Sequence, residues 1–538
     1  MSDNQDSRPD RWSRLLRAVI AVAGLLVPAA ASVPPANADA RPDPAVVRTT
    51  AGQVRGVLDA EVRSFQGIPY AAPPIDDLRW ASPQPVRSWK DVRDATAPGA
   101  ACPQAESGYP IGVPSTVEDC LYLNVTAPRR PARDLPVIVW IHGGSMMVGS
   151  GDSYRPNPLV AAGAVVVSLN YRLGVMAFLT DAALDGPAAR HGSGSLALED
   201  QQAALRWVRT NIGGFGGDPD NVTVMGQSGG GYAVCDHLAS PVSAGLFDRA
   251  VVQSAPCATG GSRTRAAAET ESAGVIAAVG CATAADVATC LRATEVTTLL
   301  DAYEATAGEP RPVSGTALLP LPPGEALRTG RFNRVPVLLG VNHDEENGRI
   351  GGAELAPGGA PMRDEAYAPA IRAEFGADAP AVLRRYPLAG DVSAGEAFAT
   401  VLTDALWSVP TLDTARMLSR WTPTHLYEFT AEDTPWYVGY PRPSFPMRAN
   451  HMSELAYLFD MAIFEELTPA QLDLRLRLAS TWVRFARTAE PARPDAWPAF
   501  RDDLRHGRYV RSLTPGRWCR ADFTDDHHYS FWKRLDRS

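Results

Sequence analysis

The segment from Asn221 to Tyr232 constrains the fold more than any other, because it reads NVTVMGQSGGGY. A short β-branched run leads into glycines on both sides of Ser228, and an apolar segment follows as far as Leu238. This order predicts a buried strand, a sharp turn and a helix. Flanking glycines permit the tight turn that lifts a serine hydroxyl above a sheet. Ser228 is therefore a candidate nucleophile, although an ordinary glycine-rich turn could carry the same pattern.

Other apolar runs occur before and after this segment, and helix-like stretches separate them. We predict further strands at Val137 to Ile141, Ala164 to Leu169, Ala250 to Gln253, Val335 to Val341 and His425 to Phe429. A strand that is apolar on both faces is typical of a parallel sheet covered on both sides. Amphipathic stretches at Leu196 to Asn211 and Leu472 to Thr488 predict long helices. The alternation predicts an α/β fold, with a mostly parallel central sheet and helices on both faces.

The 538 residues are enough for one large domain or for several smaller ones. After residue 38 the sequence shows no internal repeat and no change of composition that would mark a second domain. We therefore predict one domain over residues 39–538.

Residues 1–38 have the features of an export signal. Four arginines precede an apolar run from Ala18 to Val27, and Ala36-Asn37-Ala38 offers a small-x-small cleavage site. The apolar run is too short for a bilayer span, which needs about 20 residues. We predict a secreted protein without a stable membrane anchor. The net charge of −9 and the absence of a basic run argue against nucleic acid as a partner.

The cysteines form no CxxC pair and have no histidine cluster nearby, which argues against a zinc site. There are seven: Cys102, Cys120, Cys235, Cys257, Cys281, Cys290 and Cys519. In an exported protein, cysteines that are close in sequence are expected to form disulfides. The natural pairs by proximity are Cys102 with Cys120 and Cys281 with Cys290. The odd count leaves at least one free thiol, which we expect to be Cys235, and the pairing of the other two stays open.

A serine nucleophile needs a histidine to take its proton and a carboxylate to orient that histidine. In folds with this turn, the chain order is serine, acid, histidine. The strand Val335 to Val341 runs into Asp344, Glu345 and Glu346, which are the candidate acids. The histidines that follow are His425, His451, His506, His527 and His528. His451 is the best-placed base, because it lies in a loop after the last predicted strand, although it could also be a plain surface histidine.

Several stretches of the chain carry a family resemblance. They include FQGIPYAAPP (65–74), EDCLYLNV (118–125), VWIHGG (139–144), FGGDPDNVTVMGQSGGG (215–231), GVNHDEEN (340–347) and HMSELAYLF (451–459). With these motifs the chain resembles the type-B carboxylesterases, a family that includes bacterial para-nitrobenzyl esterases, animal carboxylesterases and cholinesterases. EDCLYLNV and FGGDP are the most specific of the stretches.

The resemblance implies an α/β-hydrolase fold with helical insertions over the active site. It also implies a serine carboxylesterase that acts through an acyl-enzyme on small-molecule esters, with no cofactor and no metal. By position, Ser228 would be the nucleophile, Glu345 the acid and His451 the base. The alternatives are an acyl transferase or lactonase with the same triad, and a non-catalytic adhesion homologue. The natural ester and the oligomeric state do not follow from the sequence.

The resemblance further implies an oxyanion hole made by backbone N–H groups of Gly144, Ser145 and Gly229. It places Ser254 in a supporting position near the triad, and it supports the two disulfide pairs named above. The chain departs from the family pattern at three positions in or next to the expected oxyanion hole. Ser145 stands where a third glycine is usual, Gly229 where alanine is usual, and Gln227 where glutamate is common.

Overall fold

The structure is a computed structural model that describes residues 43–108, 110–502 and 508–536. The predicted export signal, residues 1–38, lies outside the described residues. From Pro44 onward the chain forms one compact unit. Within the described ranges, no helix combines the length and the apolar character that crossing a membrane requires.

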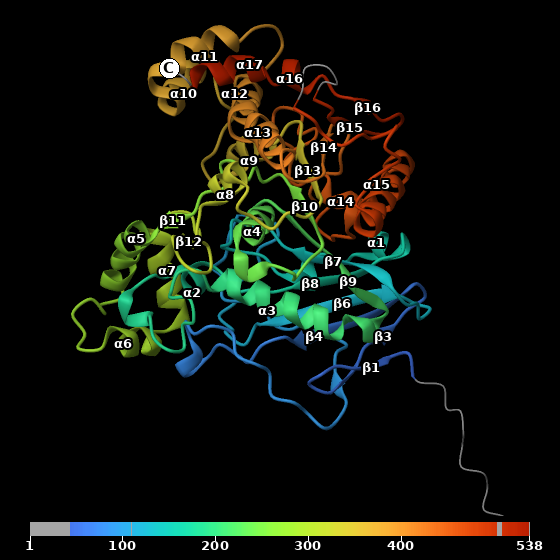
Figure 1. The fold of residues 1–538 in the computed structure, drawn as a ribbon. Helices are drawn as coiled ribbons and strands as arrows, with labels where there is room; N and C mark the ends of the chain where they lie inside the picture. Colours follow the sequence, from blue (N-terminus) through green and yellow to red (C-terminus); the bar gives the residue numbers. More distant parts are fainter. Residues whose placement is uncertain (1–42, 109, 503–507, 537–538) are drawn as a thin grey trace, which may run out of the picture. The chain divides into compact units, whose positions relative to one another are not determined.

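A large mixed sheet organises the described residues, with strand order β16-β15-β14-β13-β10-β9-β7-β8-β6-β4-β3 (Figure 1). In chain order its strands are β3 (Val57–Leu58), β4 (Val62–Pro69), β6 (Tyr122–Pro128), β7 (Leu135–Ile141), β8 (Val165–Leu169), β9 (Gly217–Gln227), β10 (Arg249–Gln253), β13 (Val337–Asn342), β14 (Thr424–Phe429), β15 (Arg511–Leu513) and β16 (Cys519–Arg520). All neighbours from β8 to β15 pair in parallel, and antiparallel strands flank them on both edges. The predicted α/β class is confirmed.

Two smaller sheets accompany the large one. The first joins β1 (Val46–Arg48), β2 (Gln53–Arg55) and β5 (Arg93–Asp94), and the second joins β11 (Arg263–Thr264) with β12 (Val313–Ser314).

From β7 to β15, helices occupy all but one of the connections between consecutive strands. The α-helices are α1 (Asn157–Ala161), α2 (Gly174–Phe178), α3 (Leu196–Asn211), α4 (Gly229–Ala239), α5 (Arg265–Ala278), α6 (Val287–Ala293), α7 (Val296–Thr306), α8 (Pro323–Thr329), α9 (Asn347–Leu355), α10 (Asp364–Phe375), α11 (Ala379–Arg385), α12 (Ala394–Thr403), α13 (Val409–Leu418), α14 (Leu455–Leu458), α15 (Pro469–Thr488), α16 (Phe523–Asp526) and α17 (Tyr529–Leu535). A π-helical segment, η7 (Asp404–Ser408), joins α12 to α13. The observed α3 has the bounds that its amphipathic pattern predicts.

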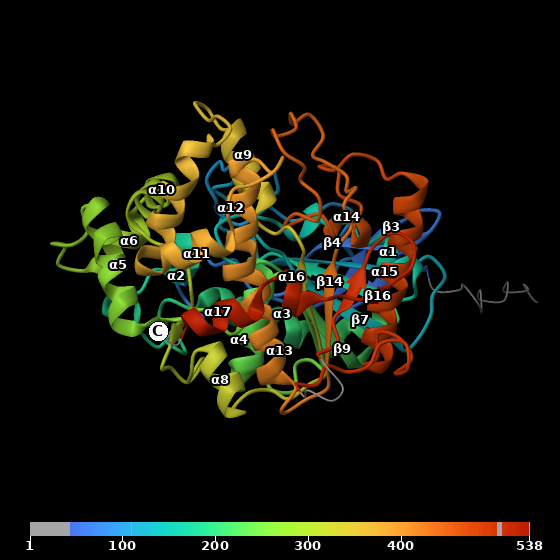
Figure 2. The ribbon, with the colours of Figure 1, turned by 90° about the horizontal axis from the view of Figure 1, so that it is seen from above.

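The central strand β7 shows why an entirely apolar run forms here. Successive side chains of a strand point to opposite faces. Val137, Val139 and Ile141 belong to the core cluster that includes the buried residues of α3 and α4. Ile138 and Trp140 belong to the cluster that includes those of α1 and α15. Figures 1 and 2 show these two pairs of helices on opposite sides of the central strands. Both faces of β7 are therefore covered.

The described residues contain three disulfides, two of which are the predicted pairs Cys102–Cys120 and Cys281–Cys290. The third joins Cys235 to Cys257, so the prediction of a free thiol at Cys235 is wrong. Cys235 lies on α4, which follows β9, and Cys257 lies just after β10, which pairs with β9. This parallel pairing brings their Cα atoms to 5.5 Å. The free, exposed cysteine among the described residues is Cys519.

Candidate active site

Ser228 occupies the turn between β9 and α4, and its backbone has φ 55° and ψ −125°, a conformation that a residue with a side chain rarely adopts. A Cβ added at Gly226 would lie 2.3 Å from the carbonyl oxygen of Gly230. A Cβ at Gly230 would lie 2.0 Å from the carbonyl oxygen of Ile141. Glycines are needed at both positions because β9, α4 and the end of β7 approach so closely that no side chain fits between them. Strained backbone of this kind is concentrated at functional sites.

The loop after β7 lies over this turn. A Cβ added at Gly143 would be 3.2 Å from the Cβ of Ser228, and a Cβ added at Gly229 would be 3.0 Å from the backbone nitrogen of Ser145. Gly144 and Ser145 both have positive φ, at 101° and 54°. The structure therefore brings the three residues expected to form the oxyanion hole together beside the serine, with Ser145 in a conformation that favours the glycine usual at this position.

Glu345 and His451 form a direct contact. The Glu345 side chain is fully buried, and its Oε2 lies 2.5 Å from Nδ1 of His451. Its Oε1 accepts a hydrogen bond of 2.8 Å from the backbone N–H of Asn342, the last residue of β13. The ring of His451 is 26% exposed, which leaves it accessible from the solvent side.

The carboxylates on either side of Glu345 bond to other partners. The Oδ2 of Asp344 lies 3.1 Å from Nδ1 of His343, and the Oε1 of Glu346 accepts a 2.7 Å hydrogen bond from the indole of Trp407. Three consecutive acidic residues thus point in three directions. The geometry separates candidates that the sequence left equivalent by position.

Neighbouring charges shift the proton affinity of His451. Burial is the largest single effect and lowers the pKa of the ring, but the charge of Glu345 and its hydrogen bond raise it. The negative charges of Glu454 and Glu346 act in the same direction. The net effect raises the pKa of His451 above the ordinary histidine value.

Gln227 connects the turn around Ser228 (residues 226–230, the nucleophile turn) to the loop that carries His451 (residues 446–453, the histidine loop). Its Nε2 donates a 2.7 Å hydrogen bond to the backbone carbonyl of His451. The hydrogen bonds among the described residues include no direct one between the hydroxyl of Ser228 and the ring of His451, so the amide of Gln227 provides the polar link between the two segments. At this position a glutamate carboxylate would repel that carbonyl, whereas glutamine can donate to it.

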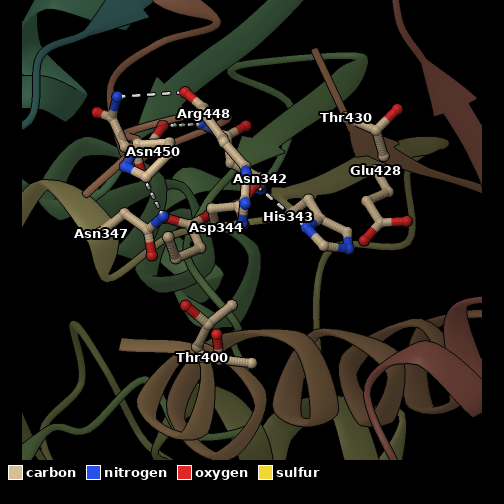
Figure 3. A network of polar contacts seen from close by, with 12 residues as sticks. Asn342, His343, Asp344, Asn347, Thr400, Glu428, Thr430, Arg448 and Asn450 are labelled. Carbon is tan, nitrogen blue, oxygen red and sulfur yellow. Dashed lines mark hydrogen bonds and ion pairs between the residues drawn. The ribbon is translucent and has the colours of Figure 1, made fainter. Parts of the chain in front are cut away.

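A buried polar network lies beneath the histidine loop. Asn342 donates from Nδ2 to the Asn450 carbonyl at 2.7 Å and to Glu454 Oε2 at 2.6 Å. Gln253 donates to the other oxygen of Glu454 at 3.1 Å and accepts from the Trp482 indole at 3.2 Å. Burial, opposed by the bond from Asn342, raises the pKa of Glu454 to about 7. Figure 3 shows how Asn342 and Asn450 approach each other from β13 and the histidine loop.

Trp407 packs against the candidate base, and no motif in the sequence indicates it. Its ring lies against that of His451, with the centroids 4.7 Å apart, while its indole bonds to Glu346. The sequence signal for this residue is weak, because a tryptophan in a long helical stretch is usually a packing residue. Trp407 belongs to the π-helical segment η7, and such segments are frequent at functional sites.

Ser254 follows β10 directly and has φ 47°. Its backbone N–H donates to the carbonyl of Gly340 on β13 at 2.9 Å. Its buried hydroxyl has no hydrogen-bond partner within the described part of the chain. The structure therefore places Ser254 at the carboxyl ends of the strands, one strand away from Ser228.

A cavity of about 750 Å³ lies between α14, the start of α15 and the 110–113 segment. Met461, Ile463, Phe464 and Arg475 are among the residues that line it. None of the three candidate triad residues borders it. We therefore assign it no part in the chemistry.

The sequence of this chain is similar to those of known esterases. The model of the carboxylesterase family matches residues 43–532. The para-nitrobenzyl esterase of Bacillus subtilis (strain 168) is 33% identical over 487 residues, which cover 86% of this chain and 93% of that protein. A cocaine esterase of Oryctolagus cuniculus is 34% identical over 497 residues, with coverage of 85% and 90%.

Solved structures agree with the sequence comparisons. The structure of a PNB esterase superposes with a TM-score of 0.73 and 31% identity, and the match covers 90% of this chain and 100% of that one. A thermophilic PNB esterase gives a TM-score of 0.72 at 31% identity, with coverage of 91% and 100%. The resemblance read from the motifs is confirmed, and the sheet is that of an α/β-hydrolase fold. The chain belongs to the carboxylesterase family and is a carboxylic ester hydrolase.

Proposed function

We propose that this protein is a secreted serine carboxylesterase in which Ser228, Glu345 and His451 form the catalytic triad. The main support for the proposal is the contact between Glu345 Oε2 and His451 Nδ1. His451 lies on a loop whose backbone accepts a hydrogen bond from Gln227, the residue before Ser228. A buried acid that holds one ring nitrogen leaves the other nitrogen free to exchange a proton with the serine and the substrate.

The reaction would proceed in two halves. Ser228 Oγ attacks the ester carbonyl carbon while His451 Nε2 takes the hydroxyl proton, and the tetrahedral oxyanion accepts hydrogen bonds from backbone N–H groups of Gly144, Ser145 and Gly229. The oxyanion then collapses, the carbon–oxygen bond to the alcohol breaks, and the alcohol leaves with the proton from His451. In the second half, water attacks the acyl carbon while His451 takes its proton. The bond from that carbon to Ser228 Oγ then breaks, Oγ regains the proton from His451, and the acid is released. The proton transfers and the stabilisation of the oxyanion in both halves use groups of the chain itself.

Secretion is supported by two independent features. The first 38 residues have the features of an export signal. The described residues contain three disulfides, and disulfides persist in oxidising compartments outside the cytosol.

Hydrolysis of short-chain para-nitrophenyl esters tests the proposal most directly. We expect steady turnover by the wild type, and its loss in Ser228→Ala but not in Ser88→Ala, which replaces an exposed serine. Mass spectrometry of the rapidly quenched reaction should detect one acyl group, on the peptide that contains Ser228.

The same assay separates the rival activities. With a short alcohol added, an acyl transferase would form the new ester in preference to the free acid, whereas the esterase should release mainly acid. A non-catalytic homologue would show neither turnover nor an acyl-enzyme, and that result would contradict the proposal.

A further inference from the structure

A second cluster of chemically reactive side chains lies outside the triad. His343 follows β13, Glu428 is on β14, and His527 comes directly after α16. Each of the three residues offers one ligand atom, and these atoms all lie within 4.8 Å of one another. The cluster joins three segments that are distant in the sequence, two of which are neighbouring strand ends.

Each histidine of the cluster is held through Nδ1 by a separate carboxylate. Asp344 Oδ2 lies 3.1 Å from Nδ1 of His343, and Asp404 Oδ1 lies 2.6 Å from Nδ1 of His527. Figure 3 shows the ring of His343 with one nitrogen toward Asp344 and its other edge facing the carboxylate of Glu428. The Nε2 atom of His527 lies 2.6 Å from Oε1 of the same carboxylate. Both rings are therefore oriented toward Glu428.

This arrangement has the features of a transition-metal site. Two imidazoles and one carboxylate are a common ligand set for zinc and related divalent ions. Metal-binding histidines almost always donate their second ring nitrogen to a carboxylate or carbonyl, as Asp344 and Asp404 allow here. Glu428 and His527 are buried, whereas the side chain of His343 is 42% exposed, which gives an ion a path from solvent.

We propose that His343, Glu428 and His527 bind one divalent transition-metal ion of the zinc class. The ion would take the place of the hydrogen bond between His527 and Glu428, and a water molecule on the side of His343 would complete its coordination. The alternative is that these residues form only a buried ion-pair network, in which His527 bridges the two carboxylates of Asp404 and Glu428.

The position of the site indicates a structural role. His343 is two residues from Glu345, and Asp404 begins the π-helical segment whose Trp407 lies against His451. A bound ion would fasten the C-terminal segment at His527 to the loop that carries the proposed acid. It should therefore stabilise the folded protein.

The test uses the mature full-length protein, freed of metal by chelation and dialysis. Co²⁺ is titrated in as a spectroscopic probe, and Zn²⁺ is then added as a competitor. We expect visible absorption bands that saturate at one Co²⁺ per chain and disappear with one equivalent of Zn²⁺. Zn²⁺ should also raise the thermal unfolding temperature.

The key variant is His343→Ala, because His343 is the most exposed ligand and its loss should disturb folding least. We expect this variant to bind Co²⁺ at least about 10- to 100-fold more weakly. A loss of about that size is typical when a residue that only hydrogen-bonds to a metal ligand is removed, and His343 would be a direct ligand. Asp344→Asn should weaken binding by about 10–100-fold on the same grounds. His191→Ala removes a histidine outside the cluster and Cys519→Ser removes the exposed thiol, so neither should change the affinity.

Thermal unfolding without metal shows whether each variant folds. Absence of saturable Co²⁺ binding by the wild type would overturn the proposal and identify the cluster as an ion-pair network only. Undiminished binding by a folded His343→Ala variant would also overturn it, as would loss of binding in Cys519→Ser.

Discussion

Replacing Glu345 with glutamine tests whether this carboxylate sets the protonation of His451. Glu345 accepts from two donors, the backbone N–H of Asn342 at 2.8 Å and Nδ1 of His451 at 2.5 Å. A glutamine side chain has one accepting oxygen and one donating NH₂ group, so it cannot present an acceptor at both positions that the two carboxylate oxygens occupy. If its oxygen keeps the bond to Asn342, its NH₂ group faces Nδ1 and the ring proton moves to Nε2. That is the atom that must take the serine proton.

We expect kcat to fall by about 10⁴-fold, the loss found when a triad acid is neutralised while its geometry is kept. At about 1.36 kcal/mol for each factor of ten, this is a loss of about 5.4 kcal/mol in transition-state stabilisation. KM should change little, because the altered bond involves the ring nitrogen that faces away from the substrate. Initial rates with para-nitrophenyl butyrate measure both constants, and thermal unfolding checks that the variant is folded.

Asp344→Asn and Glu346→Gln are matched controls, because they neutralise the flanking carboxylates. Asp344 faces His343, and glutamine at position 346 can still accept the hydrogen bond from Trp407. Both variants should keep kcat within about tenfold of the wild type, or about 1.4 kcal/mol. A folded Glu345→Gln variant that keeps more than a tenth of the wild-type kcat would refute the assignment of Glu345 as the acid. Greater damage from Asp344→Asn than from Glu345→Gln would refute it too.

Four further predictions use the same rate and unfolding assays. Ser228→Ala should lower kcat by about 10⁴- to 10⁶-fold without unfolding the protein, and near-native turnover would exclude this serine as the nucleophile. Because the pKa of His451 is raised and its neutral form is the active base, kcat/KM should fall with decreasing pH, with a midpoint above the ordinary value of about 6.5. A midpoint below that value would contradict the assigned environment. Gln227→Leu removes the hydrogen-bond donor to the histidine loop and should destabilise the fold by about 1–3 kcal/mol. It should lower kcat by a larger factor than it raises KM. Unchanged kinetics would show that this hydrogen bond is dispensable. Thiol titration of the unfolded, unreduced protein should give one thiol per chain, at Cys519, and three or more thiols would contradict the disulfide between Cys235 and Cys257. Cys235→Ala should lower the free energy of unfolding by about 2–4 kcal/mol.

The sequence by itself determined the local features of this protein. The turn at Ser228 could be predicted because the strand, the glycines and the helix that form it are contiguous. The two-sided burial of β7 and the bounds of α3 follow in the same way from side-chain periodicity. The oxyanion-hole residues after β7 were expected from the family resemblance alone, and the parallel pairing of β7 with β9 brings that loop to the same edge of the sheet as the turn.

Only the tertiary structure decided between neighbours in the chain and joined residues far apart in it. Asp344, Glu345 and Glu346 have the same charge and nearly the same sequence position, so only the family resemblance favoured Glu345. The direction of the backbone beyond β13 determines that its carboxylate is the one that reaches His451. Likewise, Cys235 pairs with Cys257 because β9 and β10 are neighbours in the sheet, a fact that sequence proximity does not contain. The approach of His343, Glu428 and His527 has the same origin, since their contacts depend on strand order and on where the C-terminal segment packs. Local propensity acts over a few residues, whereas these contacts form only when the whole sheet has assembled.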